Sequence, residues 1–385
     1  MITIENADKA LKDYYLQAVS AQLNDNVSPF FSAIEKNTDN VFGKDVKVAV
    51  VRGNTDGIAA CAEDSDLPAP YANRYLEISL PLKNIYGTIE VSDKALRASR
   101  ESSGAFVNLV NAEMEGLVSG ARYNFQRMLY GDGNGTLCKI TAADSLASTN
   151  YKYTVDDISK LSVGMKVDAI TPQNFMTEEL TITAIDDSSK VVTFDKVVLG
   201  NSVGAVVTAP GAYGNELTGL GAIFGTGNLY GYDRKEEPYF APYSKALSAE
   251  LTEDDLTDVL DYMEEHFNSK INMILCSYAT RKKIAKLAAD NKRIVNSIDA
   301  HAGFGVVTVN GVPVYADRFC PDKTIYFVNT EDFILSQLCD WEWLENEDGK
   351  ILKQVPGKAA YGATLVKYAE LICKKPCAQA VLTNV

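Results

Sequence analysis

Apolar residues recur at helical intervals along one long segment in the first third of the chain. Beginning near Ser103, they follow one another every three or four residues, which places them on one face of a helix. This stripe consists of Phe106, Val110, Met114, Leu117, Ala121, Phe125 and Met128. With Ser102 or Ser103 as the N-cap, the pattern predicts a helix over residues 103–130, about 40 Å long at roughly 1.5 Å per residue.

The predicted helix runs into the glycine-rich sequence YGDGNGT, whose chemistry can be tested against two known loops. A phosphate-binding Walker loop needs a lysine followed by Ser or Thr after its last glycine, but here Thr136 and Leu137 follow. A calcium-binding EF-hand loop starting at Asp132 needs glycine at its sixth position and glutamate at its twelfth. Those positions hold Leu137 and Ala143, so neither loop is present.

The same glycines have a structural explanation. Glycine adopts the left-handed backbone conformation that commonly ends a helix, and Gly131 or Gly133 stands at the right place for it. Asn-Gly pairs are typical of turns, and Asn134-Gly135 follows directly. The sequence therefore predicts a helix stop and a turn, not a ligand-binding loop.

Alternating apolar and polar residues predict strands on both sides of a polar segment. Residues 46–52 alternate and are rich in valine, and residues 74–92 alternate over a longer span. Between them, residues 53–73 are polar and bounded by glycine and proline. A loop of this length is unusual inside a compact domain, so we expect it to act outside its own subunit.

The segment from Leu137 to Ala209 changes to short β-branched runs separated by turn residues. Four or five strands at a spacing of roughly 8–12 residues predict a small barrel or sandwich. Because this block interrupts regions of mixed helix and strand, we expect it to be an inserted domain.

Helical and strand patterns alternate again beyond residue 250. Residues 251–268 predict a helix, with Thr252 and Asp255 placed as a capping box. INMILC predicts a buried strand, YATRKKIAKLAADN a second helix, and Asn310-Gly311 a type I′ hairpin turn between alternating strands. The whole chain is therefore expected to be α+β and built from discontinuous parts.

The C-terminal region predicts two long antiparallel strands that turn at residues 346–350. Trp341 and Trp343 are separated by one residue, so they face the same side of the first strand. We expect that side to be buried in the core or against another subunit.

Composition and charge exclude several classes of function. Of the 385 residues, 46% are hydrophobic and 23% charged, as in ordinary globular proteins, and the formal charge is −14. Such an acidic chain is unlike a nucleic-acid reader, so we expect only weak, non-specific contact with DNA. No apolar run is long enough to span a membrane, and the N-terminal residues lack the pattern of a signal peptide.

Candidate catalytic and metal-binding groups are few. Asp254, Asp258, Asp261 and Glu265 recur at helical spacing and offer a divalent-cation site or an acid–base pair, although a solvated helix face explains them better. A Cys276–His301 nucleophile and base lacks any recognisable surrounding motif. We therefore expect no catalytic residues, no cofactor and no metal.

Several stretches together resemble the major capsid proteins of tailed bacteriophages, which have the Hong Kong 97 fold. They are YLEISLPLKNIYGTIEVSDKALRAS leading into FVNLVNAEMEGLVSGARYNFQRMLYGDGNG, followed by LTGLGAIF and YDRKEEPYF. The resemblance implies a structural protein, not an enzyme, that assembles into hexamers and pentamers of an icosahedral shell enclosing double-stranded DNA. The shell would be assembled in the host cytoplasm and become part of the virion.

The resemblance also implies a division into domains. Residues 1–43 would be an N-terminal arm, 44–90 an extended loop, 137–210 an inserted β-barrel or sandwich, and 103–130 the spine helix. The remaining ranges are 91–136, 211–250 and 331–364 for the peripheral domain, with its tip at 346–350, and 251–330 and 365–385 for the axial domain.

Contacts between subunits are expected at the extended loop, at the tip of the peripheral domain and at the YDRKEEPY segment. The residues are Arg52, Asp56, Glu63, Asp64, Asp66, Arg74, Arg234, Lys235, Glu345, Asn346, Glu347 and Asp348. Portal, scaffolding and cement or decoration proteins are further candidate partners. Some capsid proteins of this family are cross-linked from a loop lysine to an asparagine, but no lysine lies between Arg52 and Arg74, so we expect a non-covalent shell.

Two alternatives remain at this stage. Encapsulin compartments share the fold, although they have no need of an added surface domain. A hydrolase or metal enzyme that uses the acidic helix at residues 250–265 belongs to a different class. Electron microscopy of the purified protein separates shells from small discrete particles.

Overall fold

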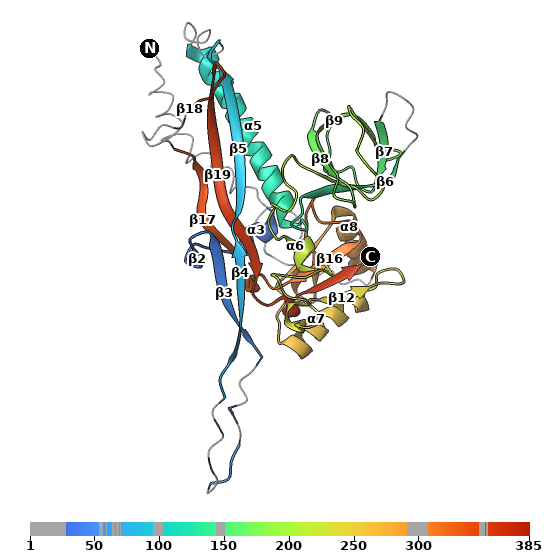
Figure 1. Ribbon diagram of the computed structural model, residues 1–385. Coiled ribbons are helices and arrows are strands. Elements are labelled where there is room, and N and C mark those ends of the chain that lie inside the picture. The colour runs from blue at the N-terminus through green and yellow to red at the C-terminus, as the bar shows by residue number, and fades with distance from the viewer. Residues whose placement is uncertain are drawn as a thin grey trace. The chain divides into compact units, whose positions relative to one another are not determined.

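The computed structural model describes residues 28–53, 57–58, 60–63, 66, 69, 71–94, 103–143, 151–290, 307–345, 351 and 353–385. The chain forms two compact units. One contains residues 1–127 and 223–385, and the other contains residues 128–222. Each unit is described by itself (Figure 1).

A long sheet carries the first unit. Its central pair is β17 (Phe333–Trp343) and β19 (Ala360–Cys373), which run antiparallel. β5 (Lys83–Ser92) pairs with β19 along its whole length, and β1 (Glu35–Asn37) runs parallel to β17. The short β18 (Lys353–Gln354) also pairs with β19. The two long antiparallel strands predicted near the C-terminus are thus confirmed, whereas their turn at residues 346–350 lies outside the described residues.

The predicted long helix is confirmed as α5 (Ser103–Leu129), and it contacts this sheet through aromatic side chains. Phe125 of α5 meets Trp341 edge to face, with ring centroids 6.1 Å apart. Phe31 contacts the same Phe125 at 5.2 Å from the one-turn helix α3 (Pro29–Ala33). Trp341 and Trp343 are both buried, as their spacing predicted.

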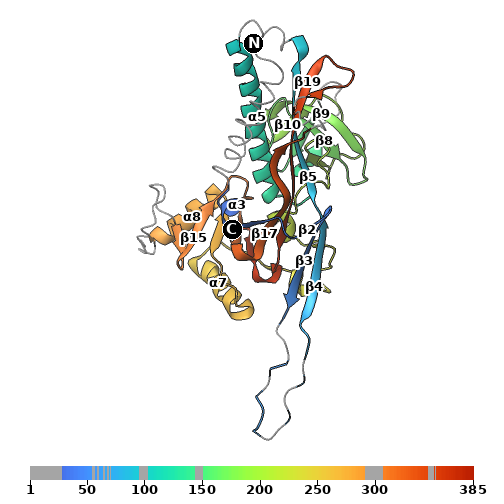
Figure 2. The same ribbon diagram turned by 90° about the vertical axis from the view of Figure 1, so that its left-hand side faces the viewer.

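Two strands form a separate hairpin within the first unit. β3 (Asp45–Arg52) and β4 (Arg74–Pro81) pair in antiparallel register from Asp45 opposite Pro81 to Arg52 opposite Arg74, and β2 (Val41–Phe42) pairs with β3. Figure 2 shows the two strands side by side. The strands predicted at residues 46–52 and at the start of 74–92 are therefore correct, and the second of these ranges holds two strands, β4 and β5.

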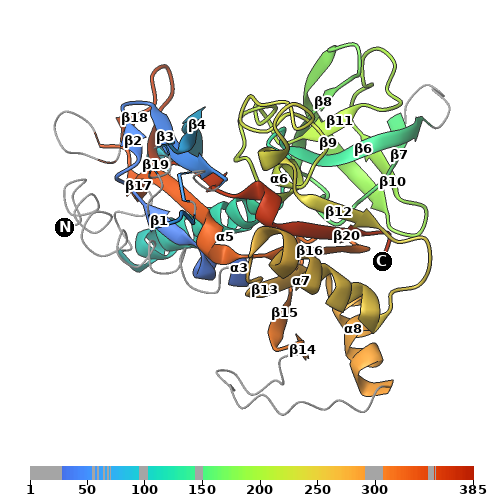
Figure 3. The same cartoon turned by 90° about the horizontal axis from the view of Figure 1, so that it is seen from below.

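A six-stranded mixed sheet completes the first unit, in the order β12, β20, β16, β13, β15, β14. These strands are Tyr243–Ala246, Ala380–Thr383, Thr324–Val328, Met273–Cys276, Val312–Ala316 and Val307–Val309. Two helices, α7 (Glu253–Phe267) and α8 (Tyr278–Asp290), share one apolar core with it (Figure 3). Alternate residues of the strands face that core, including Ile274 and Cys276 of β13 and Ile325 and Phe327 of β16.

Local signals in this region behave as predicted. Thr252 caps α7 and forms the expected capping box with Asp255, and Asn268 ends the helix in the left-handed conformation. Asn310 and Gly311 have φ values of 49° and 86°, as a type I′ turn between β14 and β15 requires. INMILC contains the buried strand β13.

The second unit contains a closed barrel whose strand order is β10, β7, β6, β11, β8, β9. The strands are Val191–Phe194, Tyr151–Val155, Thr136–Ala143, Val206–Thr208, Lys166–Ile170 and Met176–Asp186. The sequence predicted four or five strands, but closure uses six, and every one is antiparallel to both neighbours. Val167, Leu180, Val192 and Val207 are among the fully buried side chains that fill it.

The glycine-rich turn lies in this second unit. Gly133 and Gly135 have φ values of 80° and 76°, which resolves the choice between Gly131 and Gly133. The Asp132 carboxylate accepts hydrogen bonds from the Asn134 backbone N–H at 3.0 Å and from the Thr136 hydroxyl at 2.9 Å. The loop therefore satisfies itself with its own groups, as the structural interpretation requires.

Short helices connect the longer elements: α6 (Leu220–Ile223), η3 (Pro238–Phe240), η4 (Thr330–Asp332) and η5 (Pro376–Ala378). Among the described residues, no helix has both the length and the apolar character needed to cross a membrane. Residues 1–27 of the expected N-terminal arm lie outside the described part of the chain, as do residues 54–56, 59, 64–65, 67–68 and 70 of the loop.

Candidate assembly surfaces

The β3–β4 hairpin has one buried and one exposed face. Val46, Val48, Val50 and Ile78 are buried, because alternation along both strands turns them to the same side. The opposite face carries Tyr75 directly across from Val51, and both are exposed, Tyr75 by 64%. An aromatic side chain in solvent on a regular strand leaves apolar area available to another molecule.

The loop joining these strands exposes more apolar side chains. Ile58 is 83% exposed and Tyr71 61% exposed. Phe42, in β2, adds a third large exposed side chain beside the hairpin. Exposed apolar residues thus continue from the base of the hairpin into its loop.

Two polar contacts hold the hairpin to the rest of the first unit near the point where its loop begins. The Arg52 guanidinium donates a hydrogen bond of 3.1 Å to Glu237 Oε1, and Oε2 lies 3.0 Å from the same nitrogen as an ion-pair contact. The Tyr232 hydroxyl donates to the backbone carbonyl of Glu77 at 2.8 Å. The direction in which the hairpin leaves the unit is therefore set by the segment around residues 232–237.

Arg234 has a different role from the one the sequence suggested. It is only 9% exposed, and its guanidinium donates to the backbone carbonyls of Gly227, Ile223 and Phe240 at 2.6, 2.7 and 3.1 Å. The sequence suggested this arginine for a subunit contact, whereas these three carbonyls hold its guanidinium within its own unit.

The other expected contact residues fall into two groups. Glu63, Asp66, Arg74, Lys235 and Glu345 are exposed, and Arg52 is half-buried in its pair with Glu237. Asp56, Asp64, Asn346, Glu347 and Asp348 lie outside the described residues.

The candidate nucleophile Cys276 is buried in the core beneath α7 and α8. Burial raises the pKa of its thiol to about 12, so the thiol is protonated at neutral pH. Its suggested base, His301, lies outside the described residues. A protonated, inaccessible thiol cannot act as a nucleophile.

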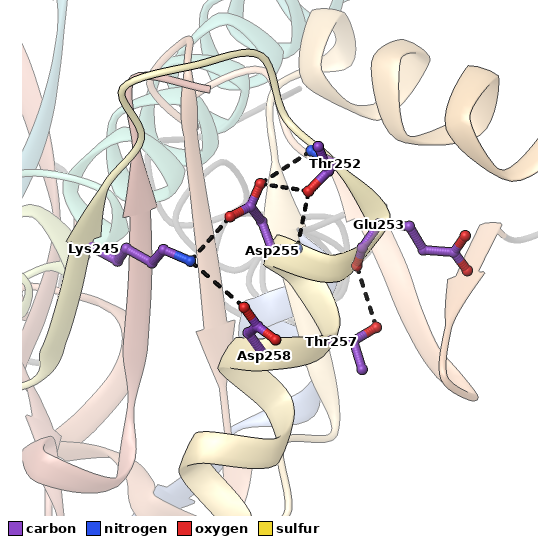
Figure 4. A network of polar contacts seen from close by, with 6 residues as sticks. All are labelled: Lys245, Thr252, Glu253, Asp255, Thr257 and Asp258. Atoms are coloured by element: carbon purple, nitrogen blue, oxygen red, sulfur yellow. Dashed lines mark hydrogen bonds and ion pairs between the residues drawn. The ribbon is translucent and has the colours of Figure 1, made fainter.

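Two carboxylates of the acidic helix α7 form ion pairs with Lys245 (Figure 4). Lys245 of β12 lies 3.0 Å from Asp255 and 3.9 Å from Asp258. Hydrogen bonds from Thr252 and then Lys245 lower the pKa of Asp255, and the Asp255 hydrogen bond raises the pKa of Lys245. Within the described ranges, no group of three or more His, Cys, Asp or Glu is arranged to hold a metal ion.

Sequence reasoning missed one polar network in the long sheet. Lys367 of β19 is 1% exposed, and its ammonium donates to Asp340 at 2.6 Å and to Gln337 at 2.9 Å, both from β17. It also lies over the rings of Phe125 and Trp341, at 5.6 and 5.7 Å from the centroids. A lysine within the apolar run LVKYAELI was the available signal.

Comparison with known proteins extends this description. No protein-family model and no curated protein sequence matches the chain. Its structure is similar to a chain of the cyanophage A-1(L) capsid, with a TM-score of 0.54, 11% sequence identity and coverage of 93% of each chain. The capsid of the native GTA particle matches with a TM-score of 0.49, 12% identity and coverage of 94% of this chain and 90% of that chain. The holo-SrpI encapsulin of Synechococcus elongatus matches with a TM-score of 0.45, 11% identity and coverage of 94% and 89%.

The likeness to the cyanophage chain extends over nearly the whole length of both proteins. At this low sequence identity, it establishes the fold. The chain therefore has a capsid-protein fold of mixed helix and strand content.

Proposed function

We propose that this chain is the major capsid protein of a tailed bacteriophage. Copies of it assemble into hexamers and pentamers, and these form an icosahedral shell around double-stranded DNA. The observation that carries the proposal is the capsid-protein fold, shared over 93% of the chain with a phage capsid protein. The exposed apolar side chains Val51 and Tyr75 on the hairpin and Ile58 and Tyr71 in its loop support it, because apolar side chains gathered in solvent are typical of contact surfaces.

We assign the residue ranges of the chain to the domains of a Hong Kong 97-type subunit. Residues 1–43 are the N-terminal arm and 44–90 the extended loop built on β3 and β4. The peripheral domain consists of 91–136, 211–250 and 331–364, with α5 as its spine helix and 346–350 as its tip. Residues 251–330 and 365–385 form the axial domain around the six-stranded sheet, and residues 137–210 are an insertion that folds as the barrel.

Contacts between copies use the exposed charges at these places. Glu63, Asp66 and Arg74 act on the extended loop, and Glu345 acts next to the tip. Asp56, Asp64, Asn346, Glu347 and Asp348 are proposed for the same surfaces from their positions in the sequence. Lys235 adds an exposed charge near the start of the hairpin loop, where Arg52 already forms an ion pair with Glu237.

The negative formal charge of the chain weakens its proposed contact with the packaged DNA. With a formal charge of −14, the shell retains DNA by confinement and makes only weak, non-specific contact with it. Portal, scaffolding and cement or decoration proteins are proposed as additional partners. Assembly takes place in the host cytoplasm, and the product is the capsid of the virion.

Electron microscopy of the purified full chain tests the proposal. We expect rings, tubes or closed shells, whereas a preparation that contains only small discrete particles under all assembly conditions would contradict it. Boiling the same particles in detergent should release one band near 42.0 kDa, because no lysine lies between Arg52 and Arg74 to form a cross-link. A ladder of larger species that resists reducing agent would show covalent joining.

A further inference from the structure

The two helices on the six-stranded sheet carry opposite charges on their exposed faces. On α7, Asp254, Asp258, Asp261 and Glu265 recur at intervals of four, three and four residues, and all are exposed. We call these four residues the acidic face. On α8, Arg281, Lys282 and Lys286 are exposed and form what we call the basic face.

Most of these charges do not stabilise their own helix. The exceptions are Asp254, which the helix dipole favours in the first turn of α7, and Arg281, whose guanidinium lies 5.4 Å from the Tyr278 ring centroid. Like charges three or four residues apart repel each other on a helix surface, and both faces contain such pairs. Glu265 lies in the last turn of α7 and Arg281 in the first turn of α8, where the helix dipole disfavours each charge. The local energetics of the two helices therefore do not account for Asp261, Lys282 and Lys286.

Partners within the described chain account for only some of these charges, since Glu265 lies 4.0 Å from His266 and Arg281 lies over the Tyr278 ring. Lys245 engages Asp255 and, at 3.9 Å, Asp258 (Figure 4). Among the residues that the structure describes, Asp254 and Asp261 form no ion pair, and neither do Lys282 and Lys286. Lys283 differs from its neighbours on α8, because its ammonium donates to the Val385 carbonyl at 3.0 Å.

The sheet places the two helices toward opposite edges. α7 packs at the β12 edge, where Tyr262 lies 4.3 Å from Tyr243 and Asp255 binds Lys245. α8 contacts β15 and β14, at the other end of the strand order. Figure 3 shows both helices beside the sheet, with β14 and β15 next to α8. α7 and α8 nevertheless contact each other, and Thr257 of α7 accepts a hydrogen bond of 3.4 Å from Asn310 in the turn between β14 and β15. One subunit thus carries a negative surface and a positive surface on two neighbouring helices.

We infer that the acidic face of α7 in one copy of this chain docks against the basic face of α8 in the next copy. The occupant is a second copy because the chain itself carries both complementary surfaces, the acidic face on α7 and the basic face on α8. Such a head-to-tail contact repeats from copy to copy and closes into a ring when the rotation between copies allows it. The inference rests on the proposed function and specifies which surfaces meet within a capsomer.

Charge reversal tests the contact with the full chain. One variant carries Asp254→Lys, Asp261→Lys and Glu265→Lys, a second carries Arg281→Glu, Lys282→Glu and Lys286→Glu, and a third combines both sets. Each single set should lower the assembled fraction at least about tenfold, because it brings like charges together. The combined variant restores opposite charges and should return to within about twofold of the unmodified chain.

Mixing gives a second, independent readout. The two single-set variants are complementary to each other, so an equimolar mixture should assemble although neither variant does alone. In the mixture, copies must alternate, so only rings with an even number of subunits can close. The unmodified chain should also lose assembly as NaCl rises to 1 M, where the screening length falls to about 3 Å. A neutralised variant, Asp254→Asn with Asp261→Asn, should lose most of this salt dependence without placing a cation in the first turn of α7.

Each result bears on either the inference or the proposed function. If the unmodified chain forms particles and the single sets assemble equally well, the inference is wrong and the proposed function stands. The same holds if the folded combined variant and the mixture both fail to assemble, or if the neutralised variant keeps the full salt response. If the unmodified chain never assembles, the proposed function fails and the inference fails with it. Circular dichroism of each unassembled variant establishes whether it is folded.

Discussion

The barrel and the β3–β4 hairpin are both antiparallel and both follow the alternating pattern, but only the barrel closes and leaves no open strand edge. In the barrel, each of the six strands has a neighbour on both sides, so no strand edge is left open. In the hairpin sheet, β4 pairs only with β3 within the described residues, and Tyr75 and Val51 are exposed on its face. The barrel is complete as a single copy, whereas the hairpin has backbone groups and apolar area that another copy can use.

The barrel and the long sheet of the first unit also satisfy buried polar groups differently. In the barrel unit, Asp168 accepts hydrogen bonds from the backbone N–H groups of Glu179 and Gly211. In the long sheet of the first unit, the buried Lys367 depends on the Asp340 side chain, which is 36% exposed. Backbone partners are held by the fold itself, whereas a pair of side chains fails as soon as one of them is replaced.

Removing the loop of the hairpin should have the largest effect, a loss of assembly. Residues 53–73 can be replaced by Asn-Gly, since Arg52 and Arg74 are already paired and a two-residue turn fits that register. We expect assembly to be lost while circular dichroism and the melting of the monomer stay close to normal. Electron microscopy measures the result, and particles at ordinary yield would mean that the hairpin does not bridge copies.

Changing Asp340 to Asn should have the next largest effect. It leaves the Lys367 cation buried without a counter-charge and should reduce the free energy of unfolding by about 3–5 kcal/mol. Lys367→Met is the matched variant. It leaves Asp340, which reaches water, and the buried Gln337 amide oxygen without their donor, so we expect a smaller loss of about 1–2 kcal/mol.

The buried Lys367 cation also makes the unfolding free energy of the unmodified chain depend on pH. Burial lowers the pKa of Lys367, so in the alkaline range the unfolded chain binds more protons than the folded one. The unfolding free energy of the unmodified chain, relative to Lys367→Met, should therefore rise with pH as the pH approaches the ordinary lysine value. Urea unfolding at several pH values checks both points, and equal losses for the two variants would contradict the asymmetry.

Tyr153→Phe should have a moderate effect confined to the barrel unit. The Tyr153 hydroxyl accepts a buried hydrogen bond of 3.0 Å from the Val198 backbone N–H, which phenylalanine leaves unpaired. Such a loss costs about 1–3 kcal/mol. In calorimetry, the transition of the barrel unit should move to lower temperature while that of the first unit does not, and a shift of both would show that the two units unfold together.

The smallest effect is expected at the ion pair of Arg52 and Glu237, where the hairpin loop begins. Glu237→Gln weakens a partly exposed pair with Arg52 and should change the unfolding free energy by less than about 1 kcal/mol. Glu77→Gln is the control, because its pair with Lys47 is more exposed, and we expect a smaller change still. A larger loss at Glu77 than at Glu237 would mean that exposure does not govern these two pairs.

Local patterns were sufficient to predict several elements. The stripe from Phe106 to Met128 predicted α5, the Thr252–Asp255 capping box predicted the start of α7, and Asn310-Gly311 predicted the hairpin of β14 and β15. Each of these signals acts between residues close in sequence, so the physics is present in a short window. Alternation also predicted β3 and β4 as strands, whereas the exposed pair of Val51 and Tyr75 depends on their register, which only the structure supplies.

Long-range pairing was decided only by the tertiary structure. Nothing near Ile85 indicates that β5 runs along β19, and nothing in the barrel segment indicates that six strands close on each other. Arg234 has the same charge as an exposed arginine and is buried only because three carbonyls converge on it. Partners brought together across many residues depend on how the whole chain buries its apolar surface, whereas periodicity and capping are properties of a few neighbouring residues.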